Sequence, residues 1–496
     1  MTARFDVAPV KHPDRFFIGG EWSRPSSSAK INVLDSATEE TFITVAEAKA
    51  ADVEKAVVAA RQAFDRGPWP KLSHLERARY MKAIGQGMRD RAEDIASVWT
   101  SQSGILYTVA MAMVGGQADE WDRYASLAET FPFIERHVPG AGGNVGLLVR
   151  EPVGVVAAII PWNGPPILIT NKIAPALLAG CTTILKASPE APSEAYIFAE
   201  ICEKVGLPAG VVNVLTADRE VSEALVRNPG VDKVTFTGST AAGRKIGAIC
   251  GERIARCTLE LGGKSAAVVL EDYDVGQAAT AIAGMAPLMS GQVCSSLTRV
   301  VIQRKRHDAM VDALSANFAV LKVGDPFDAA IQMGPLAMSR QRDRVESYIA
   351  KGKAEGAKLA VGGGRPAHLN RGYFIEPTVF GNVDNNSTIG REEIFGPVLA
   401  VIPADNDEHA IEIANDTIYG LNNSVFTNDI DRAYAVARRL RSGTVGHNVM
   451  RSDFSIAFGG FKQSGIGREG GTEGLHHFLE AKTVILDGMP SGVTVS

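Results

Sequence analysis

Residues 153–160 read Val-Gly-Val-Val-Ala-Ala-Ile-Ile, a continuous apolar run that predicts a strand buried on both faces of a sheet. Three further runs follow at residues 182–185, 211–215 and 233–236, and helical stretches separate them. Buried strands that alternate with helices are typical of a parallel sheet with helices on both faces. The sequence therefore predicts a doubly wound α/β domain.

Sheets of this kind bind ligands beyond the carboxyl ends of their strands, which makes the residues at those ends candidate site residues. These candidates are Pro161, Trp162, Asn163, Lys186, Ser188, Gly238 and Ser239. Gly238 and Ser239 precede a predicted helix whose free N–H groups would suit a pyrophosphate, although a plain helix cap explains them equally well. Lys186 could donate to ribose hydroxyls, and the alternative is a solvated lysine.

Cys294 lies in a loop of mostly small residues, Gly291-Gln292-Val293-Cys294-Ser295-Ser296, which precedes the predicted strand 299–302. A thiol needs exposure and electrostatic help to act as a nucleophile, and most free cysteines are simply buried apolar residues. The core alternative is favoured for the cysteines in apolar or helical stretches, which are Cys181, Cys202, Cys250 and Cys257. Only Cys294 lies where the backbone can bend around a ligand, so it is the candidate nucleophile.

Glu260 lies between two leucines and before paired glycines, in the stretch Cys-Thr-Leu-Glu-Leu-Gly-Gly-Lys at residues 257–264. Either a polar cleft holds this carboxylate or apolar surroundings raise its pKa, and both settings suit a general base. The alternative is an outward-facing position on a strand, which the segment alone favours equally.

Length and composition bound the class of protein. A chain of 496 residues is too long for one core and predicts two or three domains. A net charge of −5 gives no reason to expect nucleic acid or an acidic membrane as a partner. Five cysteines without regular spacing argue for a reducing compartment. Because no secretory signal and no apolar run near the ~20 residues of a membrane span are visible, a cytoplasmic protein is expected.

The remaining chain predicts helices and strands around this first sheet. The N-terminal part predicts a hairpin at 16–22, strands at 31–35 and 42–45, and helices at 51–66, 75–100 and 118–129. Residues 131–150 predict two strands about a glycine-rich turn, with a late strand at 483–486 beside them. Exposed strand edges can pair with another subunit, so an oligomer is expected, and an ordinary surface hairpin is the alternative. From residue 274 onward, helices and strands predict a second α/β unit.

Seven motifs then occur in a fixed order along the chain. They are Pro161-Trp162-Asn163, Lys186-Ala187-Ser188, Phe236-Thr237-Gly238-Ser239-Thr240, Leu259-Glu260-Leu261-Gly262-Gly263-Lys264, Gly291-Gln292-Val293-Cys294, Glu392-Glu393-Ile394-Phe395-Gly396-Pro397-Val398 and Phe458-Gly459-Gly460-Phe461-Lys462-Gln463-Ser464-Gly465-Ile466-Gly467-Arg468-Glu469. From about residue 16 to residue 486, the series resembles the NAD(P)-dependent aldehyde dehydrogenase superfamily. Each motif is moderately specific, and the ordered set of seven leaves little room for chance.

The resemblance implies oxidation of an aldehyde to its carboxylic acid through a thiohemiacetal on Cys294, hydride transfer to NAD(P)+ and hydrolysis of a thioester. The side-chain amide of Asn163 and the N–H of Cys294 would stabilise the oxyanion, and Glu260 would activate the water. Lys172 and Glu469 would form a pair that supports proton transfer. No metal is expected.

For the cofactor, the resemblance implies that Lys186 holds the adenosine ribose, that Glu393 takes the nicotinamide-ribose hydroxyls and that Phe395 packs near the nicotinamide. The other residues expected at the cofactor are Pro161, Trp162, Ser188, Gly238, Ser239 and Leu261. NAD is the expected cofactor. NADP is not excluded, because Pro189 stands where many NAD-preferring relatives carry a glutamate.

The substrate is expected to be a larger apolar aldehyde. Gly164 and Asn171 stand where the acetaldehyde and retinal branches commonly carry bulky aromatic residues, which implies a wider or longer pocket. One alternative is a semialdehyde dehydrogenase that transfers the acyl group to coenzyme A, although such relatives tend to lack the glutamate matching Glu260. The other is a catalytically silent structural relative.

The implied fold is a doubly wound parallel-sheet cofactor domain, a second α/β catalytic domain and a small β excursion for oligomerisation. Residues 1–129 and 151–262 are expected to form the dinucleotide-binding domain and residues 263–478 the catalytic domain. Residues 130–150 and 479–496 are the expected oligomerisation strands of a homodimer or homotetramer.

Overall fold

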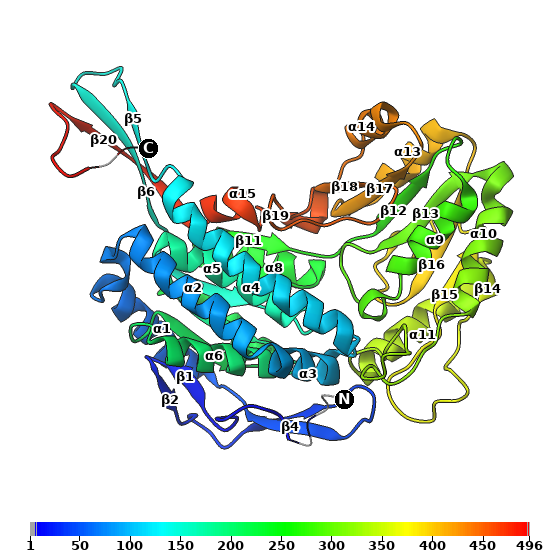
Figure 1. The fold of residues 1–496 in the computed structure, drawn as a ribbon, viewed down its shortest axis with the longest axis horizontal. Helices are drawn as coiled ribbons and strands as arrows, with labels where there is room; N and C mark the ends of the chain where they lie inside the picture. Colours follow the sequence, from blue (N-terminus) through cyan, green and yellow to red (C-terminus); the bar gives the residue numbers. More distant parts are fainter. Residues whose placement is uncertain (1–4, 6, 494, 496) are drawn as a thin grey trace.

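Two large sheets, each covered by helices on both faces, make up most of the molecule (Figure 1). The computed structural model describes residues 5, 7–493 and 495. The terminal ranges predicted for the domains also include residues 1–4, 6, 494 and 496, which lie outside the described residues. The predicted α/β fold with parallel sheets is confirmed.

The first sheet has the strand order β19-β11-β10-β7-β8-β9-β1-β2. The five strands from β11 to β9 are parallel, and β19 and β1 pair antiparallel at the two ends. The strands are β1 (Phe16–Ile18), β2 (Glu21–Ser23), β7 (Val155–Ile159), β8 (Thr182–Ala187), β9 (Val212–Thr216), β10 (Lys233–Thr237), β11 (Arg256–Glu260) and β19 (Gly465–Ile466). The four apolar runs predicted as strands are β7 to β10.

Alternate residues of these strands face two separate cores, as a sheet with two covered faces requires. Val156 and Ala158 of β7 pack in one core with helices α2 to α6, and Val155 and Ala157 pack in the other with α1, α7 and α8. The helices are α1 (Ala50–Asp65), α2 (His74–Asp90), α3 (Ala92–Ser103), α4 (Tyr107–Thr130), α5 (Pro165–Ala179), α6 (Ser193–Val205), α7 (Arg219–Arg227) and α8 (Thr240–Glu252); η1 (Trp69–Lys71) is a 3₁₀ turn.

Two of the N-terminal helix predictions need correction. The single helix predicted at 75–100 is two helices, α2 and α3, which are separated at Arg91. The Arg91 side chain donates to Glu200 and to the carbonyl of Pro9, so long-range contacts fix the break. The helix predicted at 118–129 is the last half of α4, whose first half has few charges and therefore a weak amphipathic signal.

The second sheet has the order β14-β15-β16-β13-β12-β17-β18, and all its pairs are parallel except β14 with β15. The strands are β12 (Ser265–Val269), β13 (Leu297–Gln303), β14 (Lys358–Val361), β15 (Thr378–Gly381), β16 (Val398–Ala404), β17 (Asn422–Phe426) and β18 (Thr444–His447). Helices α9 (Val275–Met285) and α10 (Arg304–Ala319) cover one face, and α11 (Ser339–Ala354), α12 (Thr388–Arg391), α13 (Asp407–Asn415) and α14 (Ile430–Ala437) cover the other.

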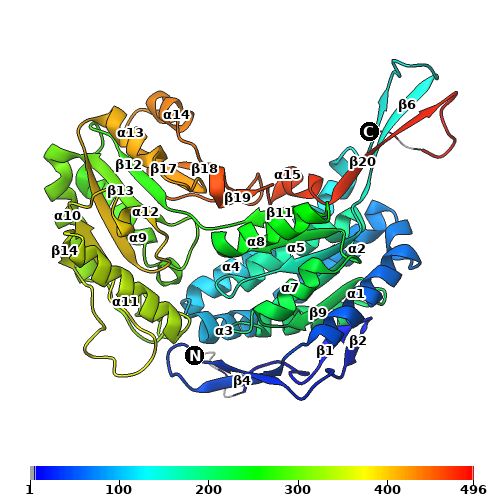
Figure 2. The same cartoon turned by 180° about the vertical axis from the view of Figure 1, so that it is seen from behind.

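A small third sheet projects from the body (Figure 2). Its order is β20-β6-β5, with β5 (Ile134–His137), β6 (Val145–Pro152) and β20 (Leu479–Leu486), so the late strand does pair with the excursion. Strands β3 (Lys30–Leu34) and β4 (Thr41–Ala46) form a separate hairpin. The shorter elements are η2 (Leu288–Gly291), η3 (Lys462–Ser464) and α15 (Gly471–His476).

Among the helices of the described residues, none combines the length and apolarity that crossing a bilayer requires. The two sheets are joined directly, because only four residues separate the end of β11 from the start of β12. The first strand of the second sheet therefore begins beside the carboxyl edge of the first.

Candidate active site

Cys294 follows a left-handed turn of the backbone in the loop between α9 and β13. Met289, Ser290 and Gly291 have φ angles of 49°, 55° and 73°, a region that L side chains rarely adopt. The Ser290 hydroxyl donates to the carbonyl of Gly334 at 2.8 Å, and Ser290 is almost fully buried. Contacts outside the loop thus hold a turn that its own backbone disfavours.

Gln292 holds the same loop from inside the protein. Its amide nitrogen donates to the carbonyls of Met289 at 3.0 Å and Ser103 at 3.3 Å, and its amide oxygen accepts from the N–H of Ala337 at 3.0 Å. The side chain is fully buried. Because both ends of the amide are bonded, the residues that lead to the thiol have a defined position.

Asn163 reaches this loop from the first sheet, between β7 and α5. Its Nδ2 donates to the carbonyl of Gln292 at 3.0 Å. The indole of Trp99 donates to the Asn163 carbonyl at 2.8 Å, and the Ser103 hydroxyl donates to that of Trp162 at 2.6 Å. The structure therefore brings the Asn163 amide beside the loop that carries Cys294, as the prediction requires.

The connection between the two sheets lies against the backbone of Cys294. A Cβ on Gly263 would lie 2.3 Å from the Cys294 carbonyl oxygen, so only glycine fits this approach. Similarly, a Cβ on Gly291 would lie 2.3 Å from the carbonyl carbon of Gly396. The thiol loop is thus packed between the connection that carries Gly263 and the segment before β16 that carries Gly396.

Glu260 is the last residue of β11 and is 2% exposed, so the outward-facing alternative is wrong. Neither carboxylate oxygen has a hydrogen-bond partner within the described part of the chain. Burial, and after it the charge of Glu469, raises the pKa of Glu260 well above its ordinary value against the opposing charges of Lys172 and Arg468. Of the two predicted settings, the structure has the one in which the surroundings raise the pKa.

Lys172 and Glu469 form a buried ion pair beside this carboxyl group. Lys172 lies on α5 and also donates to the hydroxyl of Thr235 at 3.3 Å. The two charged side chains are 0% and 2% exposed. The predicted pair is therefore present, and its charges act on Glu260 through the protein interior, where screening is weak.

The Cys294 side chain itself is half-buried. Burial, and after it the charges of Glu393 and Glu260, raises the pKa of the thiol to about 12. Burial and the nearby carboxylates thus oppose ionisation of a thiol that needs electrostatic help to act as a nucleophile. A positive charge beside the thiol would reverse this effect.

Glu393 and Phe395 come from the loop that precedes β16 in the second sheet. Glu393 accepts from the N–H of Gly263 at 3.0 Å, and burial raises the pKa of this carboxyl group to about 7. The ring of Phe395 lies 5.5 Å from that of Trp162 at an interplanar angle of 86°. The loop before β16 therefore contacts the connection between the two sheets, at Gly263, and the edge of the first sheet, at Trp162.

Gly238 and Ser239 lie between β10 and α8. The Gly238 N–H donates to the carbonyl of Glu260 at 3.0 Å, and the Ser239 hydroxyl caps α8 by accepting from the N–H of Ala242 at 3.3 Å. Ser239 is therefore a helix cap, as the alternative explanation predicted. It is compatible with an anion site, because a helix has four unpaired N–H groups in its first turn. Leu261 packs tightly under this helix, 2.4 Å from where a Cβ on Gly243 would lie.

Lys186 and Ser188 form a separate group at the end of β8. Lys186 is 7% exposed, and burial lowers the pKa of its ammonium group to about 8 against the charges of Glu190 and Asp218. The Ser188 hydroxyl donates to Glu190, which also pairs with Arg340 of α11. A carboxylate is thus present here, one position after Pro189. Pro161, which follows β7, is half-buried.

The sequence analysis did not single out Gln292, Ser290 or Glu190. A long amide side chain in a loop of small residues was the available signal for Gln292, and a carboxylate four positions after Lys186 was the signal for Glu190. The role of Ser290 had no signal, because it depends on the left-handed turn and on a carbonyl 44 residues away.

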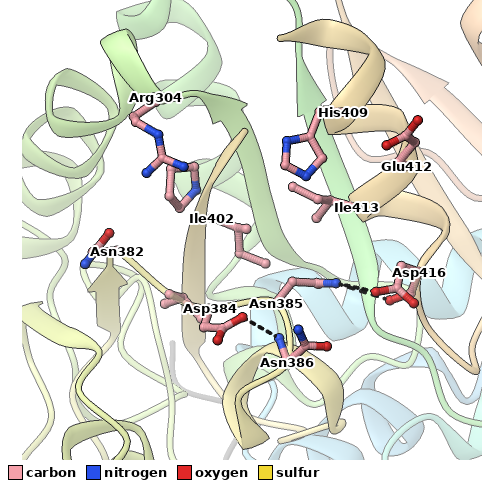
Figure 3. A pocket seen from close by; sticks show the side chains of 12 residues that line it. Arg304, Asn382, Asp384, Asn385, Asn386, Ile402, His409, Glu412, Ile413 and Asp416 are labelled. Atoms are coloured by element: carbon pink, nitrogen blue, oxygen red, sulfur yellow. Dashed lines mark hydrogen bonds between the residues drawn. The ribbon is translucent and has the colours of Figure 1, made fainter. Parts of the chain in front are cut away.

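A polar hollow of about 600 Å³ lies elsewhere, at the end of the second sheet near α13 (Figure 3). Its labelled side chains include Arg304, Asp384, His409 and Asp416. None of the predicted site residues lines it. In the described residues, no group of three or more His, Cys, Asp or Glu side chains is placed to hold a metal ion.

The family of the chain follows from comparison with known proteins. The model of the aldehyde dehydrogenase family matches residues 22–484. The chain belongs to the aldehyde dehydrogenase family. It is accordingly an oxidoreductase that acts on aldehydes, and the resemblance noted in the sequence is confirmed.

Similar aldehyde dehydrogenases match this chain over nearly its whole length. It is 43% identical to the geranial dehydrogenase of Castellaniella defragrans over 473 residues, which cover 95% of this chain and 98% of that protein. It is 37% identical to the chloroplastic betaine aldehyde dehydrogenase of Beta vulgaris over 490 residues, which cover 95% and 96%.

Solved structures of aldehyde dehydrogenases agree with this fold. The Mycobacterium tuberculosis enzyme complexed with NAD+ is 46% identical, with a TM-score of 0.93 and coverage of 97% of this chain and 99% of that chain. A mutant of aldehyde dehydrogenase C from Pseudomonas syringae, complexed with NAD+ and octanal, is 36% identical, with a TM-score of 0.93 and coverage of 98% and 100%.

The raised pKa of the Cys294 thiol predicts slow alkylation of the free enzyme at neutral pH. Thiolate is the reactive form, so we expect the rate of modification by iodoacetamide to rise about tenfold per pH unit from pH ~7 to pH ~10. Peptide mass spectrometry would follow Cys294 separately from the half-buried Cys257. Circular dichroism would check that the fold persists, and a rate that levels off below pH ~9 would contradict the raised pKa.

Proposed function

We propose that this aldehyde dehydrogenase oxidises its substrate through a covalent thiohemiacetal on Cys294. The supporting observation is that three distant segments meet at one loop. The Asn163 amide donates to the residue two positions before the thiol, and the charge of Glu260 acts on the thiol itself. A nucleophile, an oxyanion donor and a base are the groups that this reaction needs.

In this proposal, the Cys294 thiol loses its proton to solvent water, its sulfur bonds to the aldehyde carbon, and the carbonyl oxygen becomes an oxyanion. Two donors stabilise that charge. One is the second N–H of the Asn163 amide, whose first N–H is bonded to Gln292, and the other is the N–H of Cys294. Losing one such donor typically costs ~3–4 kcal/mol. The tetrahedral carbon can then release a hydride, for which NAD+ supplies the acceptor when it is bound.

Glu260 removes a proton from the water that hydrolyses the resulting thioester. Among the described residues its carboxyl group has no hydrogen-bond partner, so it can take a water as its partner. The buried pair of Lys172 and Glu469 is placed to support the protonation change of Glu260, because both charges act on its pKa. Neither member of this pair forms or breaks a bond to the substrate.

The residues predicted for NAD fit such a cofactor in this structure. Lys186 is buried and its ammonium group donates to the carbonyl of Ala217 at 3.4 Å, and an ammonium group has further donors for ribose hydroxyls. Glu393 offers a carboxylate acceptor, and Gly238 and Ser239 precede α8, whose first-turn N–H groups suit a pyrophosphate. Trp162 and Phe395 have their rings in contact near Glu393.

We infer a preference for NAD over NADP. The Glu190 carboxylate accepts a hydrogen bond from the Ser188 hydroxyl, and its negative charge favours the protonated form of Lys186. A 2′-phosphate near these residues would meet this negative charge. Arg340, the nearby cation that could bind such a phosphate, is already paired with Glu190.

Replacing Glu260 with glutamine tests the mechanism. Since Glu260 serves only the hydrolysis step, Glu260→Gln should still give a rapid burst of NADH equal to the enzyme concentration. Steady-state turnover should fall at least about 100-fold. Stopped-flow absorbance measures both phases, and intact mass spectrometry should find the acyl group on Cys294.

The matched control is Cys294→Ser, which should give no burst. Unchanged steady-state turnover of Glu260→Gln would contradict the role of the base. If added coenzyme A captured the acyl group from the wild-type enzyme as an acyl thioester, the acylating alternative would replace hydrolysis.

We propose a larger apolar aldehyde as the substrate. A Cβ on Gly164 would meet only Ile167 at 3.8 Å, so there is space beside Asn163. The segment that carries Phe454 and Phe458 adjoins the thiol loop, because Asn422 bonds to the carbonyls of both Ser295 and Arg451. The two phenylalanine rings stack at 4.3 Å. The octanal in the Pseudomonas syringae structure and the name of geranial dehydrogenase support this class.

A panel of aldehydes checks the substrate class. We expect kcat/KM for octanal and geranial to exceed that for acetaldehyde at least about tenfold, because each buried methylene contributes ~0.8 kcal/mol. Betaine aldehyde should be poor, since binding a quaternary ammonium group usually requires several aromatic faces. Formation of NADH and NADPH would be followed separately, and a clear preference for acetaldehyde would reject the proposal.

We propose that residues 1–129 and 151–262 bind the dinucleotide, that residues 263–478 supply the thiol, and that residues 130–150 and 479–496 mediate a cytoplasmic homodimer or homotetramer. The outer edges of β5 and β20 have no neighbouring strand among the described residues. Val138, which directly follows β5, is 95% exposed, and Ile485 of β20 is 51% exposed. Unpaired edges with exposed apolar side chains favour pairing with another subunit.

Charge on the projecting sheet should disturb this assembly. We expect light scattering to give the wild-type mass of a dimer or tetramer, and Ile485→Glu to lower it, because the substitution places a charge in an apolar contact. Val320→Glu, at an exposed position at the end of α10, is the control. A monomeric wild-type enzyme would contradict the proposal.

A further inference from the structure

Two thiols outside the candidate active site lie in contact where helix α8 packs on strand β11. Cys250 is in the last turn of α8, and Cys257 is the second residue of β11. The two side chains share a hydrogen bond. Cys250 is 1% exposed, whereas Cys257 is half-buried. The pair therefore has one sheltered thiol and one thiol that a small reagent can reach from solvent.

The register between the helix and the strand brings these thiols together. A Cβ on Gly243 would lie 2.4 Å from the side chain of Leu261, and a Cβ on Gly247 would lie 3.5 Å from that of Leu259. Positions 243, 247 and 250 share one face of a helix, and positions 257, 259 and 261 alternate along an extended chain and share one face of it. The glycines let the helix approach the strand closely, and the next pair along these two faces is the two cysteines.

The connection between the two thiols is short and held in place. The N–H of Ala255 donates to the carbonyl of Cys250 at 2.9 Å. The guanidinium group of Arg253 donates to the carbonyls of Val226 at 2.7 Å and Asn228 at 2.5 Å. The folded protein therefore keeps the end of α8 and the start of β11 side by side.

The two thiols differ in acidity. The hydrogen bond from Cys250, and after it the charge of Lys233 on the neighbouring strand β10, lowers the pKa of the Cys257 thiol against the effect of burial. The same hydrogen bond and burial raise the pKa of Cys250. The thiol of Cys294, by comparison, has its pKa raised to about 12. Because the thiolate is the reactive form, Cys257 is the thiol of these three that reacts first with an oxidant.

We propose that Cys250 and Cys257 form a reversible oxidation site for hydrogen peroxide, an oxidant small enough to reach a half-buried thiol. The Cys257 thiolate attacks one peroxide oxygen and becomes a sulfenic acid, and the released hydroxide combines with the proton that Cys257 lost to give water. The sulfur of Cys250 then attacks the sulfenic sulfur. An S–S bond forms, and the Cys250 proton leaves with the hydroxyl group as a second water.

In this oxidation the two thiols lose two electrons, and the peroxide gains them. A dithiol reductant reverses the reaction by exchange. The bond would tie the last turn of α8 to β11 and leave the first turn of the helix free, about 15 Å away at 1.5 Å per residue. The proposal is independent of the chemistry proposed for Cys294.

Peptide mapping of the whole protein tests the proposal. Tryptic cleavage places Cys250 in peptide 246–253 and Cys257 in peptide 257–264. The reduced enzyme would be treated with hydrogen peroxide at pH ~7, blocked with N-ethylmaleimide in denaturant and digested. We expect the two peptides to become linked at least about tenfold faster than Cys294 is oxidised, because only the thiolate reacts. Dithiothreitol should separate the two peptides again.

Two variants assign the roles of the thiols. In Cys250→Ala, Cys257 should react more slowly, because it loses its hydrogen bond, and should stop at a sulfenic acid that dimedone traps. In Cys257→Ala, Cys250 should stay reduced, because it is buried. Cys181 is the internal control, since it is fully buried and burial raises its pKa to about 11, so it should stay reduced in every protein.

An absence of linked peptides in the wild-type enzyme, or oxidation of Cys294 before Cys257, would overturn the proposal. A sulfenic acid that persists on Cys257 while Cys250 is intact would overturn the pairing. If Cys250→Ala did not fold, the linked peptides of the wild-type enzyme and an unmodified Cys250 in Cys257→Ala would still support the proposal.

Discussion

The position of the thiol depends on a backbone turn that costs free energy. Met289, Ser290 and Gly291 are consecutive left-handed residues, and each non-glycine residue in this region costs on the order of 1 kcal/mol. The turn persists because Ser290 and the Gln292 amide bond to carbonyls elsewhere in the fold. The rest of the fold therefore has to be in place before the Cys294 thiol has its position.

Burial and neighbouring carboxylates set the electrostatics of the candidate site. The Glu260 carboxyl group is buried and has a raised pKa, and the Cys294 thiol is hard to ionise beside two carboxylates. In the interior, the same carboxylates would respond strongly to an added positive charge, because screening there is weak. A positive charge placed beside the thiol would therefore favour its ionisation.

The sequence predicts the fold well where the signal is local. The apolar runs that became β7 to β10 specify a parallel sheet by themselves, and the order of the motifs specifies the family. The helix prediction for residues 75–100 failed because the break at Arg91 is fixed by Glu200 and by the chain near Pro9, which are far away in sequence.

The site could be predicted residue by residue but not as a network. Asn163, Glu260 and Cys294 have recognisable neighbours in the sequence. The direction of the thiol pKa shift could not be foreseen, because it depends first on the burial of the thiol and then on how closely Glu393 and Glu260 approach it in space. The same holds for the contact of Glu190 with Ser188, which depends on the path of the chain after β8.

Gly263, Gly291 and Gly459 let main-chain or carboxylate atoms approach within 2.7 Å of where a Cβ would lie around the reacting groups. At these three positions there is no space for a side chain. Directed evolution toward new aldehydes would therefore have to work at other positions, such as Gly164, Asn171 and Phe454 of the proposed substrate site. Libraries that randomise the three glycines should return almost only the parent residue.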